Sequence, residues 1–450
     1  MILKKLILDY SPESWMKYFS AISHLPWAIL LSSGQADHDD NRFDIITADP
    51  VITLTTCRKK TTIIKNNKIY SSFDDPLVIL QQQLCHFNCS LENHPDLPFI
   101  GGAMGLFGYD LGRHFEKLPS HSQADLQTPD MTIGIYNWSV IIDHHLQKVT
   151  LVSLENPYSR YTWLIQYRNI KIPVFKLTSP WNTNIDFKQY SDKFNKIKEF
   201  ITFGDCYQVN LGQRFHANYC GDEWQAFCEL NVTNKAPFSA FLRLPYSCLL
   251  SFSPERFIKL NDKIITTSPI KGTLPRLYDP VSDQLQIQKL SSSLKERAEN
   301  LMIVDLLRND LGSIAKPGSV CVTKLFEVKS FPAVHHLVST VQAYLDNGNA
   351  TDLLRACFPG GSITGVPKIR AMEIIEELEP HCRNAWCGSI GYISLCGQMD
   401  TNINIRSIIA EKQKMYCSAG GGIVADSDLE KEYKETLDKI KNIMLILNSF

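Results

Sequence analysis

The 450-residue sequence lacks several features that define particular classes of protein. It has almost no excess charge, with 46 Lys and Arg against 47 Asp and Glu. Without a basic surplus, no broad field is available to attract nucleic acid or an anionic membrane, so neither is expected as a partner. No apolar run reaches the roughly 18 residues that span a bilayer. Charged residues interrupt the first eight, and no small-residue cleavage site follows them. The sequence therefore predicts a cytoplasmic globular protein.

The cysteines also lack the spacing of a metal or disulfide framework. There are 13, an odd number, and none forms a Cys-x-x-Cys pair. This usage predicts free and mostly buried thiols in a reducing compartment, and no zinc site. No cysteine stands in the nucleophile-elbow setting of a glutamine amidotransferase, so glutaminase chemistry is not expected in this chain.

The hydrophobic pattern predicts both strands and helices. Residues Thr132–Val152 alternate and are rich in β-branched side chains, which is typical of strands. Residues Asp186–Phe203 place apolar side chains at helical spacing. The length allows two to three domains, and a provisional boundary near residue 185 separates residues 1–185 from residues 186–450.

Two further helices carry most of the acidic motifs. The first is expected over Leu294–Leu311 and the second over Leu429–Leu447. Each begins with a capping-box pattern, Ser293 with Glu296 and Ser427 with Glu430. The second helix is expected to bury a stripe made of Tyr433, Leu437, Ile440, Met444 and Leu447.

These helices each present two glutamates three residues apart, Glu296 with Glu299 and Glu432 with Glu435. Residues at this spacing share one helix face. If the two faces meet, their hard carboxylate oxygens suit Mg²⁺. The alternative is that all four lie on solvated faces. Lys439 could then form an ordinary i,i+4 pair with Glu435, or it could meet a substrate carboxylate.

Lys271 lies in a short segment between Pro269 and Gly272, sixteen positions after Glu255. The sequence predicts a turn there, and a lysine held in it is a candidate covalent nucleophile. Glu255 is a candidate acid for protonating a leaving group. The alternative for Lys271 is a solvated turn residue.

Residues Asp400–Ile409 alternate and predict a strand whose polar face includes Arg406. An arginine can offer a bidentate fork to a carboxylate, although a surface strand would show the same pattern. The next expected strand ends in Gly420–Gly422. A glycine run lets backbone N–H groups approach an anion, but it also occurs in ordinary turns.

Five blocks of the sequence resemble the chorismate-utilising enzymes, a family that includes anthranilate, isochorismate and salicylate synthases. The resemblance runs from about Leu25 to the end of the chain. It implies an α+β fold, in which an antiparallel β-sandwich core has helices packed outside and two subdomains interleave their strands. The blocks are Glu299–Asp310, Phe331–Ser339, Phe358–Gly365, Asn384–Ser389 and Ser418–Ser427.

The lysine at position 271 is the residue that separates branches of this family, because anthranilate synthases carry alanine there. The resemblance therefore implies the branch that aminates chorismate at C4. In that reaction the amine of Lys271 attacks C2, and Glu255 protonates the leaving C4 hydroxyl. Ammonia then attacks C4 and expels the lysine. The product is 4-amino-4-deoxychorismate, the precursor of 4-aminobenzoate in folate biosynthesis. The match also places His336 near the breaking C4–O bond, although one of two adjacent histidines is more often structural.

The same match implies the ligands of Mg²⁺ and of chorismate. Glu299 and Glu435 are expected to bind the metal directly, and Glu296 and Glu432 through water. Gln208 stands where isochorismate and salicylate synthases carry a lysine base, and glutamine cannot activate water in that way. The expected substrate contacts are Arg406, Ser362, Gly421, Gly422, Trp386, Tyr392, Lys439 and Gln208. The two aromatic residues in this set could instead be core.

A second site and a partner follow from the resemblance alone. One set of residues matches the segments that bind L-tryptophan in the family, where the ligand is regulatory or structural and the pocket is sometimes an empty vestige. Ammonia is expected to come from solution or from a separate glutamine amidotransferase subunit, component II. A non-catalytic binding module on the same scaffold is the alternative from another class. The predicted tryptophan residues are Ser33, Asp40, Asn41, Arg42, Phe43, Pro237, Phe238 and Ser239.

Overall fold

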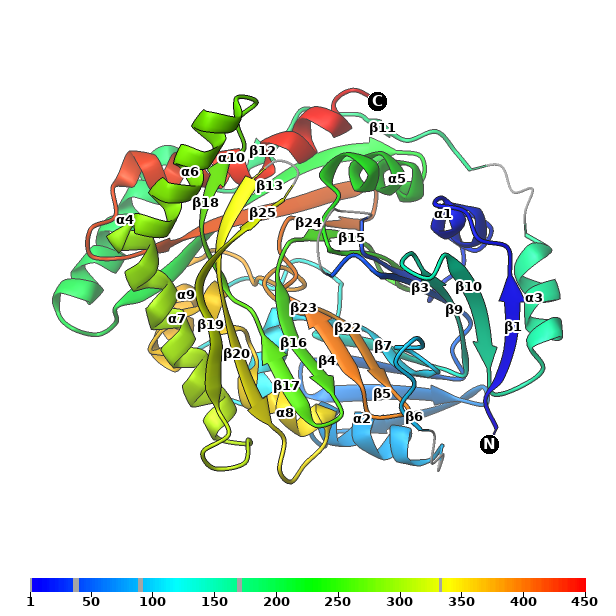
Figure 1. Ribbon diagram of the computed structural model, residues 1–450. Helices are drawn as coiled ribbons and strands as arrows, with labels where there is room; N and C mark the ends of the chain where they lie inside the picture. Colours follow the sequence, from blue (N-terminus) through cyan, green and yellow to red (C-terminus); the bar gives the residue numbers. More distant parts are fainter. Residues whose placement is uncertain (1, 35–39, 88–91, 168–171, 332–333) are drawn as a thin grey trace.

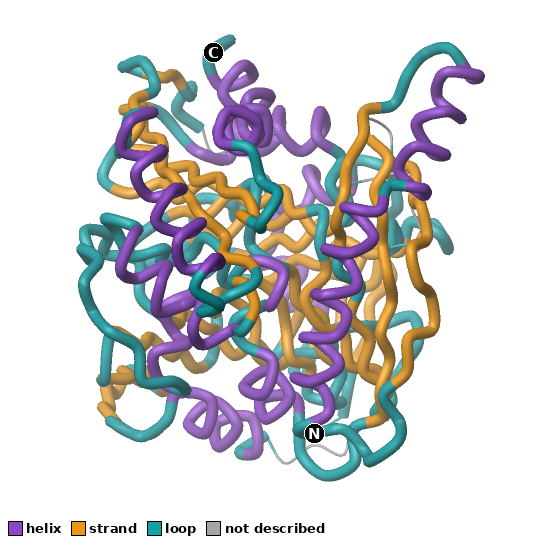
Figure 2. Tube along the Cα trace, turned by 90° about the vertical axis from the view of Figure 1, so that its left-hand side faces the viewer, coloured by secondary structure: helices purple, strands orange, loops and turns teal. Residues whose placement is uncertain are grey.

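The computed structural model describes residues 2–34, 40–87, 92–167, 172–331 and 334–450. Two large antiparallel sheets, of 13 and 12 strands, form its centre, and helices lie outside them (Figures 1 and 2). The predicted α+β sandwich is therefore confirmed. The helices are α1 Ser14–Phe19, α2 Pro76–Cys85, α3 Pro157–Ile165, α4 Phe187–Thr202, α5 Glu223–Asn234, α6 Pro280–Ser292, α7 Leu294–Gly312, α8 Ala350–Cys357, α9 Lys368–Leu378 and α10 Leu429–Leu447, with 3₁₀ helices η1 Tyr109–His114 and η2 Gly361–Ile363.

The first sheet combines strands from both ends of the chain. Its order is β1 Lys4–Leu8, β10 Lys148–Ser153, β9 Trp138–Asp143, β3 Phe43–Thr47, β2 Ile29–Ser32, β14 Phe238–Arg243, β15 Cys248–Ser253, β24 Ser407–Glu411, β25 Lys414–Ile423, β13 Gln208–Cys220 and β11 Lys176–Leu177. The short strands β12 Asn182–Thr183 and β21 Gly365–Val366 also pair with β13.

The second sheet also combines strands from both ends of the chain. Its order is β18 Ile270–Pro275, β20 Val334–Tyr344, β17 Ile264–Thr267, β16 Arg256–Asn261, β23 Met399–Asn402, β22 Ser389–Ser394, β7 Gly102–Phe107, β8 Met131–Tyr136, β4 Ile52–Cys57, β5 Lys60–Lys65 and β6 Lys68–Ser72, with β19 Cys321–Ser330 on β20. Strands from before and after residue 185 are neighbours in both sheets, as in β2 with β14 and β7 with β22. The domain boundary near residue 185 stays a prediction.

Alternation along the strands produces three apolar layers. Side chains of Ala240 and Leu242 from the first sheet meet Met104 and Ile390 from the second in the space between the sheets. Phe241, on the opposite face of β14, packs toward α1 and α5 instead. This alternation is what a strand buried on both faces produces. A further cluster packs α2, α7 and α8 against the outer face of the second sheet.

The chain crosses between the sheets twice at one place. β15 belongs to the first sheet and β16 to the second, so the residues between them cross over. β23 and β24 make a second crossing in the opposite direction. The backbones of the two crossings are hydrogen-bonded, with Ile403 N donating to Glu255 O over 3.0 Å and Ser253 Oγ to Ile403 O over 2.6 Å. The sheets are thus joined at one edge of the interior.

Several local predictions are confirmed and others are wrong. The strands expected over Thr132–Val152 are β8, β9 and β10, and the helix expected from Asp186 is α4, with Asp186 and Gln189 forming a capping box. The strand predicted over Asp400–Ile409 is wrong, because it is broken into β23 and β24 by the crossing. Arg406 ends that crossing with φ of 51°.

The predicted cap of α10 is wrong, and its predicted apolar stripe is confirmed only in part. Asp428 caps the helix by accepting from Lys431 N, while Ser427 Oγ donates to the Glu432 carboxylate. Ile440 and Leu447 are buried as predicted, and Tyr433 and Met444 are half-buried, but Leu437 is 37% exposed because Glu432 and Thr436 take inward positions. The buried face is made of Glu432, Thr436, Ile440, Ile443 and Leu447.

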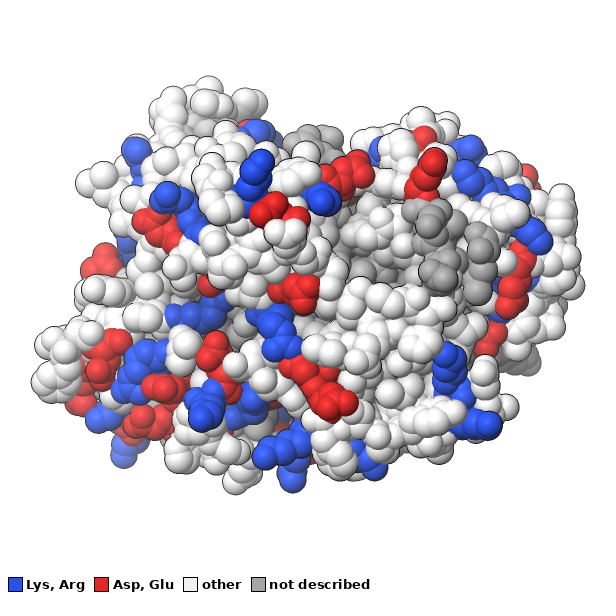
Figure 3. Space-filling model, turned by 90° about the horizontal axis from the view of Figure 1, so that it is seen from below, with Lys and Arg blue, Asp and Glu red and all other residues white. Residues whose placement is uncertain are grey.

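The cysteines and the charged side chains can be compared with what the composition predicts. All 12 cysteines in the described ranges are free thiols, but only five of them are buried, fewer than expected. Lys, Arg, Asp and Glu are interspersed on the face in Figure 3, in line with the net charge of −1. Among the described helices, none is long and apolar enough to cross a bilayer.

Candidate active site

Lys271 and Glu255 face each other across the joined edge of the sheets. Glu255 lies in the crossing between β15 and β16 and is 6% exposed. Lys271 lies on β18, so the predicted turn is wrong, although Gly272 forms a bulge after it. Both side chains reach the η2 turn, where Lys271 Nζ donates to Ser362 O over 3.3 Å and the Ser362 side chain lies close enough to the Glu255 carboxyl to lower its pKa. The structure thus brings together the predicted nucleophile, acid and serine.

Burial shifts the pKa values of both Lys271 and Glu255. It lowers the pKa of Lys271 below its usual value, the Lys439 ammonium adds to the effect, and the carboxylates of Glu299 and Glu255 oppose it. Burial also raises the pKa of Glu255, against hydrogen bonding from Ser362 and the charge of Lys271. These directions favour a neutral amine and a protonated carboxyl, which are the forms that nucleophilic attack and acid catalysis require.

The glycine after Lys271 is needed for close packing of α7. Gly272 has φ of 76°, and a Cβ built on it would lie 2.7 Å from Glu296 Oε2. A larger residue would be strained at this φ and would displace the Glu296 and Leu290 side chains. The bulge therefore lets the acidic face of α7 approach the lysine.

The four predicted metal-site glutamates lie in one region. Burial, reinforced by Glu296 and Glu432, raises the pKa of Glu299 to about 7, while Lys271 opposes the shift. Burial raises the pKa of Glu296 and of Glu432 as well. For Glu435 burial is outweighed by the Lys439 ammonium, 2.7 Å away, so its pKa is lowered. The faces of α7 and α10 therefore converge, while the Glu435 side chain stays 52% exposed at the rim of this region.

These carboxylates fit a hard divalent cation without forming a finished ligand set. In the described part of the chain, no three His, Cys, Asp or Glu side chains are grouped so that they could hold a metal ion. Crowded carboxylates with raised pKa values are nevertheless groups that a cation would stabilise. Mg²⁺ usually takes only one or two protein carboxylates and fills its sphere with water and substrate oxygens. The donor chemistry is therefore suitable for Mg²⁺.

Arg406 is a half-buried cation that pairs with no anion among the described residues. Burial alone lowers its pKa, with no carboxylate to offset it. Among the described residues, none forms a hydrogen bond or ion pair with its guanidinium. Its backbone is held by the crossing, since Phe252 N donates to Arg406 O. A substrate carboxylate would supply the partner that the fold omits.

The glycine strand β25 lies between Gln208 and α10. A Cβ on Gly421 would lie 3.1 Å from Glu432 Oε2, and one on Gly422 would lie 2.9 Å from Gln208 Nε2. Lys439 Nζ donates to Gly420 O over 2.8 Å, so it pairs with both the strand and Glu435. Gln208 is fully buried, yet neither polar atom of its side chain has a partner in the described ranges. An unpaired buried amide is costly and indicates a ligand or water position.

The remaining predicted contacts are less central. His336 is buried on β20 and its Nδ1 lies 2.8 Å from Thr273 Oγ1, two residues after Lys271. Trp386 lies behind β13, where a Cβ on Gly212 would be 2.4 Å from its ring. Tyr392 belongs to the apolar layer between the sheets and contacts Phe99. It is therefore core, the alternative that its aromatic type had left open.

The predicted tryptophan residues lie on the other side of the same crossing. Arg256, next to Glu255, pairs with Asp40 over 2.8 Å and with Asp400 over 2.9 Å, and stacks on Phe238. Ser33 Oγ donates to Asn41 Oδ1, and Ser239 pairs with Ser32 between β14 and β2. Arg42 instead forms ion pairs with Asp96 and Asp143 and lies over Phe43, while Pro237 is buried just before β14.

The sequence interpretation missed one group of residues, the segment that follows α9. Arg383 and Glu379 are buried and form a bidentate pair behind the site. Their i,i+4 spacing was visible in the sequence, but it suggests a surface helix pair, and nothing local showed that the helix ends before them.

The chain belongs to the chorismate binding enzyme family, whose model matches residues 29–445. It is 57% identical to aminodeoxychorismate synthase component 1 of Salmonella typhimurium over 440 residues, 98% of this chain and 97% of the relative. The Escherichia coli protein of the same name is 57% identical over 428 residues, covering 95% and 94%. The chain is therefore an enzyme of this family and resembles this branch of it.

Solved structures agree on the fold. Anthranilate synthase component I from Streptococcus pneumoniae has a TM-score of 0.79 and 32% identity, with 91% of this chain and 93% of that chain covered. The menaquinone-specific isochorismate synthase MenF from Escherichia coli has a TM-score of 0.75 at 17% identity, with 99% and 94% covered. The second likeness concerns the fold alone.

Proposed function

We propose that the chain is component I of an aminodeoxychorismate synthase, which converts chorismate and ammonia to 4-amino-4-deoxychorismate and water. The observation that carries this proposal is Lys271 itself. Its amine lies between Glu255, Ser362 and Glu299, and burial lowers its pKa. An alanine there, as the resemblance gives for anthranilate synthases, would leave no nucleophile. The 57% identity to relatives of this name supports the same branch.

The reaction consists of two allylic displacements. The neutral amine of Lys271 forms a bond to C2 of chorismate, the ring double bonds shift, and the C4–O bond breaks. Glu255 gives its proton to the leaving hydroxyl, which departs as water. Ammonia then bonds to C4, the double bonds shift back, and the C2–N bond to Lys271 breaks. The proton released by ammonia returns to Glu255, so the enzyme is restored.

Other residues orient the substrate. Arg406 provides a bidentate cation for a carboxylate or for the enolpyruvyl group. Gln208 and the strand Gly420–Gly422 offer hydrogen-bond donors on the opposite side of the site. His336, held by Thr273, assists the departing hydroxyl. Gln208 cannot act as a base to activate water, and this favours amination over hydration.

Mg²⁺ is the cofactor we propose for the faces of α7 and α10. Glu299 and Glu435 would hold it directly, with Glu296 and Glu432 in hydrogen-bonding support. When bound, the ion neutralises the substrate carboxylate and orients the ring. Without it, Glu299 competes for a proton near neutral pH.

A glutamine amidotransferase subunit would supply ammonia. This proposal is supported by the words "component 1" in the names of the relatives and by the absence of a glutaminase motif in the sequence. L-Tryptophan remains a candidate structural ligand beside Arg256. The product would feed 4-aminobenzoate and folate synthesis, and the enzyme would act in the cytoplasm.

The deciding experiment is product identification. The purified chain is incubated with chorismate, MgCl₂ and ammonium chloride at pH 8.5. The products are then separated by chromatography and identified by mass spectrometry. We expect 4-amino-4-deoxychorismate with ammonium, and with glutamine only when component II is added. Anthranilate as the main product would overturn the assignment. Turnover of glutamine by the chain alone would overturn the claim that it needs a partner.

A further inference from the structure

The segment from Glu379 to Cys387, which follows α9, contacts three separate pieces of the site. It lies between β13 and the η2 turn, on the side of both that faces away from Lys271 and Glu255. None of its charged side chains touches Lys271 or Glu255 in the described structure. Its contacts are nevertheless directed at the backbones that carry the site.

Arg383 makes most of these contacts. Its Nη1 donates to Ile363 O over 2.8 Å, and its Nη2 donates to Asn210 O over 2.8 Å. Ile363 directly follows Ser362, the residue that contacts both Lys271 and Glu255. Asn210 lies on β13 opposite Gly422. One guanidinium therefore joins the serine turn to the strand that faces the glycine run, in addition to the backbone pairing of β21 with β13.

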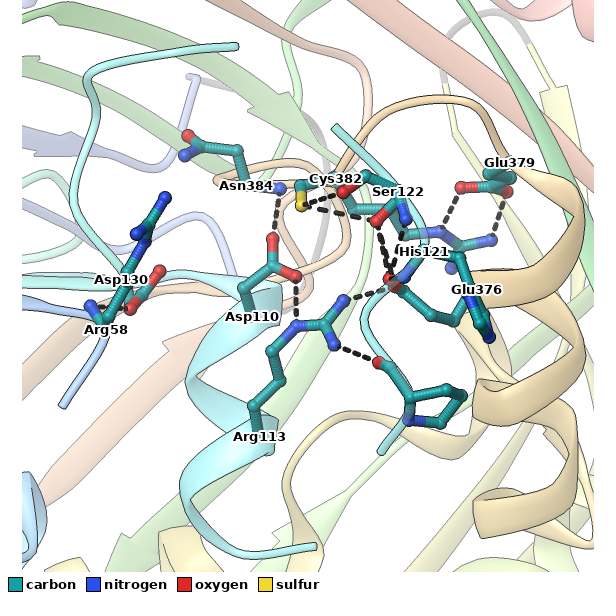
Figure 4. A network of polar contacts seen from close by, with 12 residues as sticks. Arg58, Asp110, Arg113, His121, Ser122, Asp130, Glu376, Glu379, Cys382 and Asn384 are labelled. Atoms are coloured by element: carbon teal, nitrogen blue, oxygen red, sulfur yellow. Dashed lines mark hydrogen bonds and ion pairs between the residues drawn. The ribbon is translucent and has the colours of Figure 1, made fainter. Parts of the chain in front are cut away.

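Glu379 holds that guanidinium in its plane. Its carboxylate accepts from Arg383 Nε over 2.9 Å and Nη2 over 2.7 Å, and also from Gly212 N over 2.8 Å. The side chain of Arg383 is 2% exposed and lies 4.8 Å from the ring of Trp386 and 4.9 Å from that of Tyr109. Figure 4 shows Glu379 beside a second network, in which Arg113 joins Asp110 to Glu376.

The same segment also holds the second crossing. Cys387 N donates to Asn404 O over 2.9 Å, and Asn404 Nδ2 donates to Ala385 O over 2.7 Å. Asn404 is two residues before Arg406. The serine turn, β13 and the arginine crossing are thus all tied to one short stretch of chain.

We propose that Arg383, oriented by Glu379, is a positioning residue that fixes the Ser362 turn against β13 and thereby aligns Lys271 and Glu255 on bound chorismate. The proposal rests on the function proposed above. Displacement of reacting groups by about 1 Å can reduce a rate by about 100-fold, so the effect belongs to catalysis and not only to folding.

Arginine is suited to this task and lysine is not. A guanidinium offers five N–H donors in one plane, whereas an ammonium is a single point that cannot reach Ile363, Asn210 and Glu379 in fixed directions. Stability alone gives little reason for the pair, because apolar replacement of a buried ion pair is often neutral or stabilising.

The first test compares Arg383→Lys with Arg214→Lys. Arg214 is a matched control because it is also a buried arginine and lies on β13, the strand that Arg383 contacts. It forms an ion pair with Asp125 over 2.5 Å and does not contact the η2 turn in the described structure. Chorismate affinity is measured by calorimetry, kcat and KM by product formation, and folding by thermal melting. We expect Arg383→Lys to lower kcat/KM at least about 10-fold per folded molecule, and Arg214→Lys to change it less than about twofold. The pH profile of kcat should shift only in Arg383→Lys, because only there is Ser362 displaced from Lys271 and Glu255.

A second variant separates folding from positioning. The double change Arg383→Met with Glu379→Leu replaces the pair by apolar side chains, and it should lose activity while remaining folded. Wild-type kinetics in either folded variant would overturn the proposal, as would failure of both variants to fold, since the pair would then be structural. If the wild type binds chorismate but makes no 4-amino-4-deoxychorismate, the proposed function is wrong. The role of Arg383 is then decided by comparing the chorismate affinity of Arg383→Lys with that of Arg214→Lys.

Discussion

Glu255 and Arg256 are adjacent, yet they serve two regions of opposite character. On the Glu255 side lie charged and polar groups without protein partners. Arg406 has no anion and Gln208 has two unpaired atoms among the described residues. Burial, reinforced by the neighbouring Glu296 and Glu432, raises the pKa of Glu299 to about 7.

On the Arg256 side the charges are paired. Arg256 contacts both Asp40 and Asp400, and it also stacks on Phe238. Arg42 is paired twice as well. We call the group of Asp40, Phe238, Arg256 and Asp400 the Arg256 cluster.

The difference shows what each region contributes. Unpaired buried groups reduce stability and are retained where a ligand completes them. Paired groups need no ligand, and removing one partner lowers stability because it leaves the other charge uncompensated. Mutations should therefore have opposite signatures on the two sides, with loss of activity near Lys271 and loss of stability in the Arg256 cluster.

The largest effect is expected for Lys271→Ala. Removing the nucleophile should reduce amination at C4 by more than about 1000-fold under saturating ammonium, because the amine that forms the covalent bond is lost. The melting temperature should change little. Product formation is followed by mass spectrometry, with the exposed Lys148→Ala as control, and we expect part of the attack to move to C2. Persistence of C4 amination at the wild-type rate would remove the covalent step from the account.

Glu299→Gln should separate activity from stability. We expect activity to fall by at least about 100-fold, since a metal ligand is worth several kcal/mol. A carboxyl whose folded pKa is raised to about 7 costs stability as pH rises from about 4.5 to 7, and that cost persists above pH 7. At pH 8 with a chelator, the variant should therefore unfold with a free energy higher by on the order of 2 kcal/mol.

Urea unfolding and magnesium titration check these two expectations. Glu435→Gln should lose activity in the same way, whereas Glu296→Gln and Glu432→Gln should weaken magnesium affinity by only about 10-fold. Unaltered titrations in all four variants would mean that the carboxylates do not bind the metal.

In the Arg256 cluster, Asp400→Asn should show the reverse. Weakening a largely buried ion pair should lower the free energy of unfolding by about 2 kcal/mol, while kcat per folded molecule stays within about threefold. Asp305→Asn is the control, because its pair with Arg308 is more than half exposed and should be worth less than about 1 kcal/mol. A large fall in kcat with unchanged stability would erase the contrast between the two sides.

The smallest effect concerns the titration of Lys271. An amine reacts when neutral, so a lowered pKa moves its half-maximal acylation to lower pH. Labelling with acetic anhydride over a pH series, read by peptide mass spectrometry, should show this shift relative to Lys148. Glu299→Gln should shift it further, because the Glu299 carboxylate raises the pKa of Lys271. Equal midpoints for the two lysines would contradict the burial argument.

Local patterns predicted the elements well where one face of a helix or strand decides the structure. Helix α4 follows from the spacing of its apolar residues, and the ends of α7 follow from its N-cap Ser293 and from Gly312. The strand predicted over Asp400–Ile409 was wrong because alternation continues through a crossing between sheets, and period alone cannot show which sheet a strand joins. The exposure of Leu437 on α10 has a related cause, since a functional glutamate replaces an apolar residue inside.

The candidate residues were predicted mainly by resemblance, while the structure shows how they meet. Spacing indicated the paired glutamates, but nothing in the sequence placed α7 beside Lys271 through Gly272. The Arg383–Glu379 pair escaped notice because its contacts are long-range and directed at backbone atoms. Such contacts leave no periodic pattern in a single sequence.

The central claim is that Lys271 bonds to C2 of chorismate, and trapping that bond tests it most directly. The chain is incubated with chorismate and MgCl₂ without ammonia, quenched with acid, and weighed intact and after proteolysis. We predict a mass gain of one chorismate less one water on the peptide that contains Lys271, absent in Lys271→Ala and lost when ammonium is added before quenching. An unmodified Lys271 peptide in an enzyme that still aminates C4 would contradict the account.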